Sequence, residues 1–225
     1  MTVAEYSQAN QDTLVVLLTK EKKNGWYVEI GANDPIITSN TCLLEDKYQW
    51  KGLMVEWDQN FLPAYRVRRP LASYLMGDAS TFKYDEILHN LQFPSKIDYL
   101  QIDLDVDNRS TLTTLEIFDR TVFDKYTFGV VTFEHDIYRG NFFNTQEESR
   151  TIFEKHGYVR LFSNVSVFFE NQWCAFEDWY AHPTLIDNEW IQKIVNHPDN
   201  KETIDNAVCI DIVQSVKNQL KKIVV

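Results

Sequence analysis

The sequence has few cysteines: Cys42, Cys174 and Cys209 are the three among 225 residues. Their number is odd and their spacings are long, so we expect neither a disulfide framework nor a cysteine-based metal site. The chain also lacks an apolar run near the roughly 20 residues that a transmembrane helix requires. Its first residues contain no basic segment followed by an apolar core, which argues against a signal peptide. We therefore expect a reduced, cytoplasmic protein without membrane insertion.

Basic residues are scarce relative to acidic ones. The chain has 22 Lys and Arg against 33 Asp and Glu, a formal net charge of −11 at pH 7. Such a chain has no general attraction for phosphate backbones, so nucleic acid is a poor candidate for the partner. The hydrophobic fraction of 44% is ordinary for a globular domain, and the aromatic fraction of 14% is high. The length suffices for one sizeable α/β domain.

Apolar runs alternate with amphipathic segments along the chain, which predicts alternating strands and helices. We expect strands at residues 26–30, 53–57, 71–76, 97–104, 127–133, 158–163 and 165–170. The last two are expected to pair as a tight antiparallel hairpin. Helices are expected at residues 5–20, 42–48, 59–66, 83–91, 109–118, 145–156 and 187–195, with a final one ending near residue 222. The predicted fold is a Rossmann-like, seven-stranded α/β sheet, mostly parallel with an antiparallel last strand, and with helices on both faces.

We expect a single domain over residues 1–225. It would comprise an N-terminal helical segment (1–24), a ligand-binding core (25–170) and a C-terminal helical arm or lid (171–225). Residues 173–182 mix aromatic and acidic side chains, and three interpretations stay open for them. They could form a lid that stacks on a sugar, the packing surface of the arm, or a homodimer contact.

Acidic residues follow the ends of the first three predicted strands. The carboxyl ends of parallel strands meet at one edge of a sheet, where ligands bind. A carboxylate there can accept hydrogen bonds from ribose hydroxyls, a glycine lets the backbone approach a ligand, and a tryptophan can pack on an adenine. A helix cap at Glu56 and an Asx turn at Asp78 explain those two acids about as well. The residues concerned are Glu29, Gly31, Glu56, Trp57, Asp78 and Ala79.

A denser group of acids, with one histidine, lies at the ends of the fourth and fifth predicted strands: Asp103 and Asp105, then Glu134, His135 and Asp136. Carboxylate oxygens from two adjacent strand ends favour a hard-cation site. A raised pKa of one acid, or an acidic cap on the following helix, are the alternatives. His135 could also act as a base, bind a transition metal, or be a structural residue.

The ordered series of strand-end motifs resembles class I S-adenosylmethionine-dependent methyltransferases, and more closely the FkbM-type family. The motifs that carry the closer resemblance are VEIGAND (residues 28–34), SNT with LLE (39–45), KGLMVEW (51–57), DYLQIDLD (98–105) and VTFEHD (131–136). Two positions depart from the usual pattern. Pro35 and Val106 stand where such turns commonly have a small residue or glycine.

The resemblance implies a cofactor, S-adenosylmethionine, and a set of residues to hold it. Glu29, Gly31 and Asn33 would hold its methionine end, Glu56 its ribose, and Asp78 with Ala79 its adenine. The further expected cofactor contacts are Ser39, Asn40, Trp57 and Asp103.

The implied activity is O-methylation of a hydroxyl on a small-molecule or glycan acceptor, with a sugar as the expected substrate. Asp105 would be the base, and Asp103 and His135 would assist. A divalent cation, Mg²⁺ or Mn²⁺, would be held by Asp103 with Glu134 and with His135 or Asp136, as in some sugar O-methyltransferases.

Two alternatives stay open. An apolar strand followed by Asp103-Leu104-Asp105 is also how metal-dependent glycosyltransferases hold a metal and a nucleotide sugar, although this leaves Glu29 and Glu56 unexplained. A binding module that keeps the cofactor fold without catalysis is the other.

Overall fold

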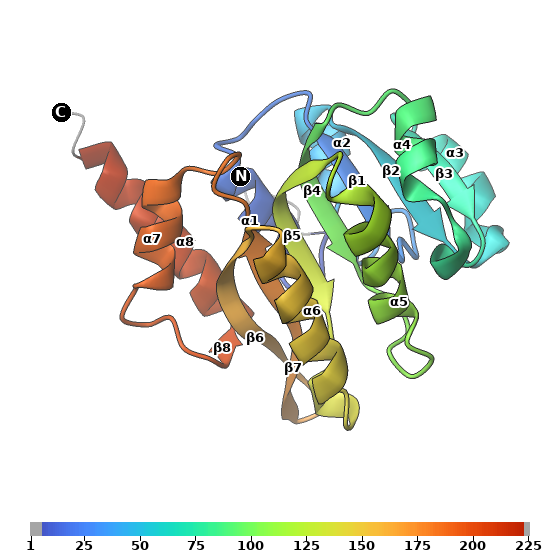
Figure 1. Cartoon of the computed structure of the whole chain (residues 1–225). Helices are drawn as coiled ribbons and strands as arrows, with labels where there is room; N and C mark the ends of the chain where they lie inside the picture. Colours follow the sequence, from blue (N-terminus) through green and yellow to red (C-terminus); the bar gives the residue numbers. More distant parts are fainter. Residues whose placement is uncertain (1–5, 223–225) are drawn as a thin grey trace.

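The computed structural model describes residues 6–222 (Figure 1). Within this range the chain forms one eight-stranded sheet in the order β3-β2-β1-β4-β5-β7-β6-β8. The strands are β1 (Trp26–Ile30), β2 (Lys51–Glu56), β3 (Ala72–Met76), β4 (Lys96–Ile102), β5 (Thr127–Glu134), β6 (Val159–Phe169), β7 (Gln172–Ala181) and β8 (Ile204–Asp205). Strand β7 is antiparallel to both of its neighbours, and the other neighbouring pairs are parallel.

Helices cover both faces of the sheet (Figure 1). One face carries α1 (Gln11–Leu18), α2 (Cys42–Tyr48), α3 (Leu62–Arg68), α7 (Asn188–Val195) and α8 (Asn206–Lys222). The other carries α4 (Tyr84–Asn90), α5 (Ser110–Ile117) and α6 (Phe143–Lys155). Short turns of helix occur at Gln59–Phe61, Ala79–Thr81, Phe118–Val122 and Ile137–Arg139.

Alternation along the strands supplies a hydrophobic core to each face. Successive side chains of a strand point to opposite faces, so β1 contributes Tyr27 to one core and Val28 and Ile30 to the other. All three side chains are fully buried. Apolar burial of this kind is worth about 25 cal/mol per Å² removed from water, and it fixes which residues of β1 can face a ligand.

The predicted Rossmann-like, mostly parallel sheet with helices on both faces is confirmed. The sheet has eight strands where seven were predicted: the last two predicted strands are both part of β6, and strands β7 and β8 were not predicted. The predicted first helix begins at Gln11, later than the expected residue 5, which itself lies outside the described residues. None of the helices formed by residues 6–222 combines the length and apolarity needed to cross a membrane.

The predicted hairpin within residues 158–170 is wrong. Residues 159–169 form one continuous strand, and Asn164 is a left-handed residue (φ 51°) at a register irregularity inside it. The chain turns back after this strand, at Glu170 and Asn171, which have φ values of 47° and 64°. Two successive left-handed residues give the turn twist that antiparallel strands prefer. Residues 172–181, predicted as part of a helical arm or lid, are therefore strand β7 inside the sheet.

Strands β2 and β3 are added on one side of β1, and β4 and β5 on the other, so the direction of strand addition reverses between β1 and β4. The carboxyl ends of these two strands are therefore the expected place for a ligand. The Asp103 backbone N–H donates a hydrogen bond to the Ile30 carbonyl oxygen (2.9 Å). This close pairing leaves no space beside Gly31, whose φ is 86°. A Cβ added there would lie 1.7 Å from the Asp103 carbonyl oxygen.

We expect Gly31→Ala to destabilise the protein by at least about 2 kcal/mol, because left-handed strain adds to the overlap with the β4 backbone. Urea unfolding would measure it. Gly140→Ala is a matched control, since Gly140 is extended (φ 170°) and a Cβ added there would lie 3.4 Å from its nearest non-neighbouring atom. Equal stability losses for the two variants would contradict this account of the β1–β4 junction.

Candidate functional site

Two adjoining cavities lie at the carboxyl edge of the sheet. The small cavity, about 390 Å³, lies beyond β2 and β3, and the large cavity, about 600 Å³, lies beyond β1, β4 and β5. Glu56, Leu104 and Asp105 line both cavities, so the two meet at these residues. The predicted site residues that line them are Glu29, Gly31, Asn33, Asn40, Glu56, Trp57, Asp78, Ala79, Asp103, Asp105, Glu134 and Asp136.

The small cavity combines a flat apolar surface with oriented carboxylates. Trp57 is 70% exposed at its rim. Asp78 Oδ1 accepts hydrogen bonds from the Ser80 hydroxyl (2.7 Å) and backbone N–H (2.9 Å), and these bonds lower the pKa of Asp78. Ala79 is buried beside it, at the start of a helical turn. The cavity can therefore present an aromatic ring and an ionised acceptor to a planar polar ligand.

Glu56 lies where the two cavities meet. Its Oε2 accepts a hydrogen bond from the Asn33 N–H (2.8 Å), and its Oε1 accepts one from the Asp58 N–H (2.8 Å). These two bonds hold the carboxylate in place, and each oxygen retains capacity to accept another hydrogen bond. The hydrogen bond from the Asn33 N–H also holds the turn after Gly31 against the end of β2.

Glu29 is 1% exposed at the base of the large cavity. Its Oε1 accepts a hydrogen bond from the Asn40 N–H (3.0 Å), and its Oε2 accepts one from the Thr41 hydroxyl (2.5 Å). Burial raises the pKa of Glu29, while the charge of Arg69 and these hydrogen bonds oppose the increase. Glu29 therefore anchors the loop that carries Asn40 as well as lining the cavity.

Two predicted site residues, Ser39 and His135, line neither of the two cavities that residues 6–222 form there. Ser39 is buried in the loop before α2, where its hydroxyl accepts hydrogen bonds from Arg69 Nη1 (3.0 Å) and the Cys42 N–H (3.2 Å). It supports the loop from behind.

The prediction that Glu134, His135 and Asp136 share one crevice does not hold for His135. Side chains alternate at the end of β5, so His135 points to the opposite face from Glu134. There it is fully buried, with Nε2 3.4 Å from Asp178 Oδ1 and 3.3 Å from Gln146 Nε2. Its surroundings belong to β7 and α6.

The four predicted metal ligands do not converge. His135 faces away, and Asp136 Oδ2 already accepts a hydrogen bond from Arg139 Nη1 (3.1 Å). Among residues 6–222, no group of three or more His, Cys, Asp or Glu side chains is arranged to hold a metal ion. The guanidinium of Arg139 supplies positive charge beside these acids instead.

Asp103 and Glu134 remain as a hydrogen-bonded pair of carboxyl groups. Burial raises the pKa of Glu134 well above its ordinary value, and the charge of Asp103 and a hydrogen bond between the two groups raise it further. Burial also raises the pKa of Asp103, but the hydrogen bond with Glu134 opposes that increase. Two buried carboxyl groups this close do not both ionise freely, so the pair holds a shared proton.

Several residues of this site were not predicted from the sequence. Gln8, Gln11, Thr38 and Arg139 line the large cavity. Gln11 Nε2 donates to both carboxylate oxygens of Glu177 (3.2 Å each), a fully buried acid on β7 that lies opposite Glu134. Glu177 was not predicted as a site residue because residues 173–182 were assigned to the C-terminal arm or lid and not to a strand of the sheet. Arg69, the buried partner of Glu29, had no local signal at all.

Comparisons with models of known protein families and with curated proteins find no match for the chain. Solved structures do match. Rv0187 from MTB, solved with bound cofactor, aligns with a TM-score of 0.52 at 14% identity, over 79% of this chain and 81% of that one. The O-methyltransferase TomG from Streptomyces achromogenes, involved in tomaymycin synthesis and solved in complex with SAM, gives 0.52 at 13% identity, over 80% and 82%.

A third match is the precorrin-6y C5,15-methyltransferase from Geobacter metallireducens. Its TM-score is 0.51 at 11% identity, over 80% of this chain and 92% of that one. The fold is that of the class I S-adenosylmethionine-dependent methyltransferases. At these identities the matches establish the methyltransferase fold and leave the reaction to be argued from the site.

Burial raises the pKa of Glu177 to about 8, with the charge of Asp103 adding to the effect, against an ordinary value of 4.5. Between these values the folded protein holds a proton that the unfolded chain has lost, so stability should fall as pH rises from about 5 to 8. We expect Glu177→Gln to reduce that slope, by at most roughly 1.4 kcal/mol per pH unit.

Urea unfolding at several pH values would measure the slope. Glu147→Gln, at an exposed position on α6, is the control and should leave it unchanged. An unaltered slope in the Glu177 variant would show that this acid titrates normally.

Proposed function

We propose that the protein is an S-adenosylmethionine-dependent O-methyltransferase whose acceptor is a sugar or glycan hydroxyl. The observation that carries the proposal is the pair of cavities that meet at Glu56 and Asp105, at the carboxyl edge of a methyltransferase sheet. The proposed placement within the FkbM-type family rests on the sequence motifs.

The residues present suit the cofactor. Trp57 and Asp78 would take the adenine in the small cavity, and Glu56 would accept hydrogen bonds from the ribose hydroxyls. In the large cavity, Asn40 is 5% exposed, and its Oδ1 has no hydrogen-bond partner among residues 6–222. A buried acceptor without a partner is costly, and the amino group of a methionine moiety would satisfy it. The bound cofactor would supply an electrophilic methyl group.

The large cavity favours a neutral acceptor rich in hydroxyl groups. Carboxylates accept hydrogen bonds from hydroxyls and repel phosphates and other carboxylates. Arg139 is the one cationic side chain among the residues that line this cavity. The acids that line it are Glu29, Glu56, Asp103, Asp105, Glu134 and Asp136.

A shallow extension of the large cavity adds aromatic surface. It shares Gln8, Glu134 and Asp136 with the large cavity and is also lined by Tyr138 and Phe169, which are 41% and 57% exposed. Aromatic faces beside hydrogen-bonding acids suit the apolar face of a sugar ring.

The acceptor hydroxyl must lose a proton as its oxygen is methylated. We propose that Asp105 takes this proton, because it is exposed at the junction of the two cavities, and that Asp103 and Glu134 orient the acceptor. Asp105 Oδ1 is held by the Asp107 N–H (3.1 Å). Assistance by a divalent cation is a further part of the proposal: Asp103 and Glu134 would have to release their shared proton, and water or the acceptor would have to complete the ligand set, because residues 6–222 provide no group of three potential ligands.

The glycosyltransferase alternative requires Asp103 and Asp105 to share a metal. Asp103 instead pairs with Glu134, and Asp105 is exposed. That alternative also gives no role to the small cavity. We therefore prefer the methyltransferase.

Purified protein should bind S-adenosylhomocysteine with a Kd between about 1 µM and 1 mM by calorimetry, and should not bind UDP or GDP sugars. With S-adenosylmethionine it should transfer a methyl group to members of a panel of neutral sugars, detected by mass spectrometry, and not to sugar phosphates. Loss of activity in EDTA and recovery with Mg²⁺ would support the metal, whereas full activity in EDTA would remove it. Failure to bind S-adenosylhomocysteine would overturn the proposed function.

With an acceptor from that panel, Asp105→Asn should lower kcat by at least about 100-fold, because a positioned base contributes that much. Its affinity for S-adenosylhomocysteine should change by less than about threefold, since the lost group acts on the acceptor. Asp103→Asn is the matched comparison. A fully active Asp105 variant beside an inactive Asp103 variant would assign the base to Asp103.

A further inference from the structure

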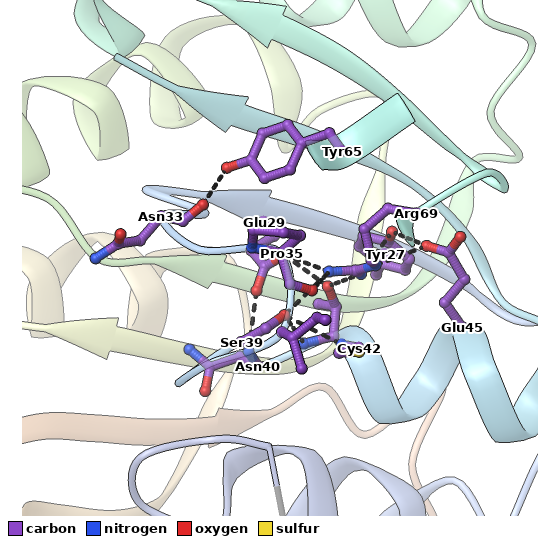
Figure 2. A network of polar contacts seen from close by, with 12 residues as sticks. Tyr27, Glu29, Asn33, Pro35, Ser39, Asn40, Cys42, Glu45, Tyr65 and Arg69 are labelled. Carbon is purple, nitrogen blue, oxygen red and sulfur yellow. Dashed lines mark hydrogen bonds and ion pairs between the residues drawn. The ribbon is translucent and has the colours of Figure 1, made fainter. Parts of the chain in front are cut away.

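Arg69 is a fully buried arginine at the end of α3, facing the loop between β1 and α2 (Figure 2). A guanidinium is expensive to remove from water unless its donors are satisfied and its charge is paired. Burial alone would lower the pKa of Arg69, but the nearby Tyr27, Glu29 and Glu45 side chains raise it above its ordinary value. The side chain is thus a permanent buried cation, and its partners show what it holds.

Its donors reach three parts of the chain: strand β1, helix α2 and the loop of residues 35–41 (Figure 2). Such a fork of fixed donors restrains all its partners at once. The contacts are Nε to Glu45 Oε2 (3.0 Å), Nη1 to Ser39 Oγ (3.0 Å) and to the Pro35 carbonyl oxygen (3.2 Å), and Nη2 to Tyr27 Oη (3.1 Å) and Thr41 Oγ1 (2.5 Å).

The Thr41 hydroxyl connects Arg69 to Glu29. It accepts a hydrogen bond from Arg69 Nη2 and donates one to Glu29 Oε2 (2.5 Å). Glu29 Oε2 is also 4.0 Å from Arg69 Nη1, so the two charges are paired. The other Glu29 oxygen accepts from the Asn40 N–H (3.0 Å). Both oxygens of Glu29 therefore hold the loop, and Arg69 compensates the charge that makes this possible.

The loop of residues 35–41 borders the large cavity. Thr38 and Asn40 line it, and the buried Asn40 Oδ1 lacks a hydrogen-bond partner among residues 6–222. Thr38 is left-handed (φ 60°), a conformation that a β-branched residue adopts only when its surroundings impose it. Restraint of this loop from behind, through Pro35, Ser39 and Thr41, is what keeps Asn40 in place.

We propose that Arg69 is a positioning residue for the cofactor: it holds residues 35–41 so that Asn40 is presented to the methionine end. This inference rests on the proposed function. Without the fork, the loop would become ordered only when the cofactor binds, and the free energy of ordering the loop would reduce the affinity for the cofactor. The effect should fall on affinity rather than on the chemical step, so KM for S-adenosylmethionine should rise while kcat at saturation stays within about threefold.

Arg69→Lys keeps the charge and loses the fork. It should weaken S-adenosylhomocysteine binding at least about tenfold by calorimetry, since several loop contacts are lost together. Thr41→Val preserves the shape of a buried side chain and removes the bridge from Arg69 to Glu29. It should fold normally and weaken binding about threefold or more.

Arg150→Lys is the matched control. Arg150 on α6 also forks onto a buried carboxylate, with Nε 2.6 Å from Asp178 Oδ2 and Nη2 3.1 Å from Asp178 Oδ1, but on the opposite face of the sheet. It should lower the melting temperature as Arg69→Lys does, and leave binding within about twofold.

Wild-type affinity in both the Arg69 and the Thr41 variants would overturn the inference, as would equal weakening in the Arg150 variant. If Arg69→Lys fails to fold, the Thr41 variant decides alone. No binding by the wild-type protein would overturn the proposed function itself and this inference with it, an outcome distinct from the others.

Discussion

The structure depends on the close approach of β1 and β4 at their carboxyl ends. The hydrogen bond from the Asp103 N–H to the Ile30 carbonyl oxygen brings the two backbones together, and a side chain at position 31 would have no room. The chain leaves β1 toward β2 and leaves β4 toward β5, so the space above this junction opens to both sides. The small and large cavities are these two sides, and every further property of the site follows from what lines them.

The charged residues that line the two cavities are mainly acidic, and arginines compensate part of the charge. Arg69 pairs with Glu29 and Glu45 behind the loop before α2, and Arg139 pairs with Asp136 at the far side of the large cavity. On the opposite face Arg150 pairs with Asp178. Burial opposes ionisation of Asp178, yet its bonds to His135 and Arg150 lower its pKa below the ordinary value. Buried carboxylates of this number require such partners.

Much of this could be predicted from the sequence, because strand-end positions follow from local patterns. A buried apolar run that ends in an acid places Glu29, Glu56 and Asp103 at one edge, whatever the details of packing. Alternation also determines the position of His135, and the expectation that it joined Glu134 neglected that rule.

Other features depend on contacts that no local pattern reveals. Arg69 lies 40 residues from Glu29 along the chain, and nothing beside it in the sequence distinguishes it from the exposed Arg66 and Arg68. The β6–β7 hairpin was misplaced because Asn164 resembles a turn residue. The turn lies at Glu170 and Asn171 instead. The residues after it, predicted as part of an arm or lid, therefore form strand β7, which carries Glu177.

The central claim is that the two adjoining cavities along this edge together accept an adenosyl ligand with its methionine end at the loop held by Arg69. A crystal structure of the protein with S-adenosylhomocysteine tests it most directly. We expect the adenine beside Trp57 and Asp78, the ribose on Glu56, and the amino group at Asn40 Oδ1. A ligand bound elsewhere, or bound in the reverse direction with its adenine in the large cavity, would contradict it.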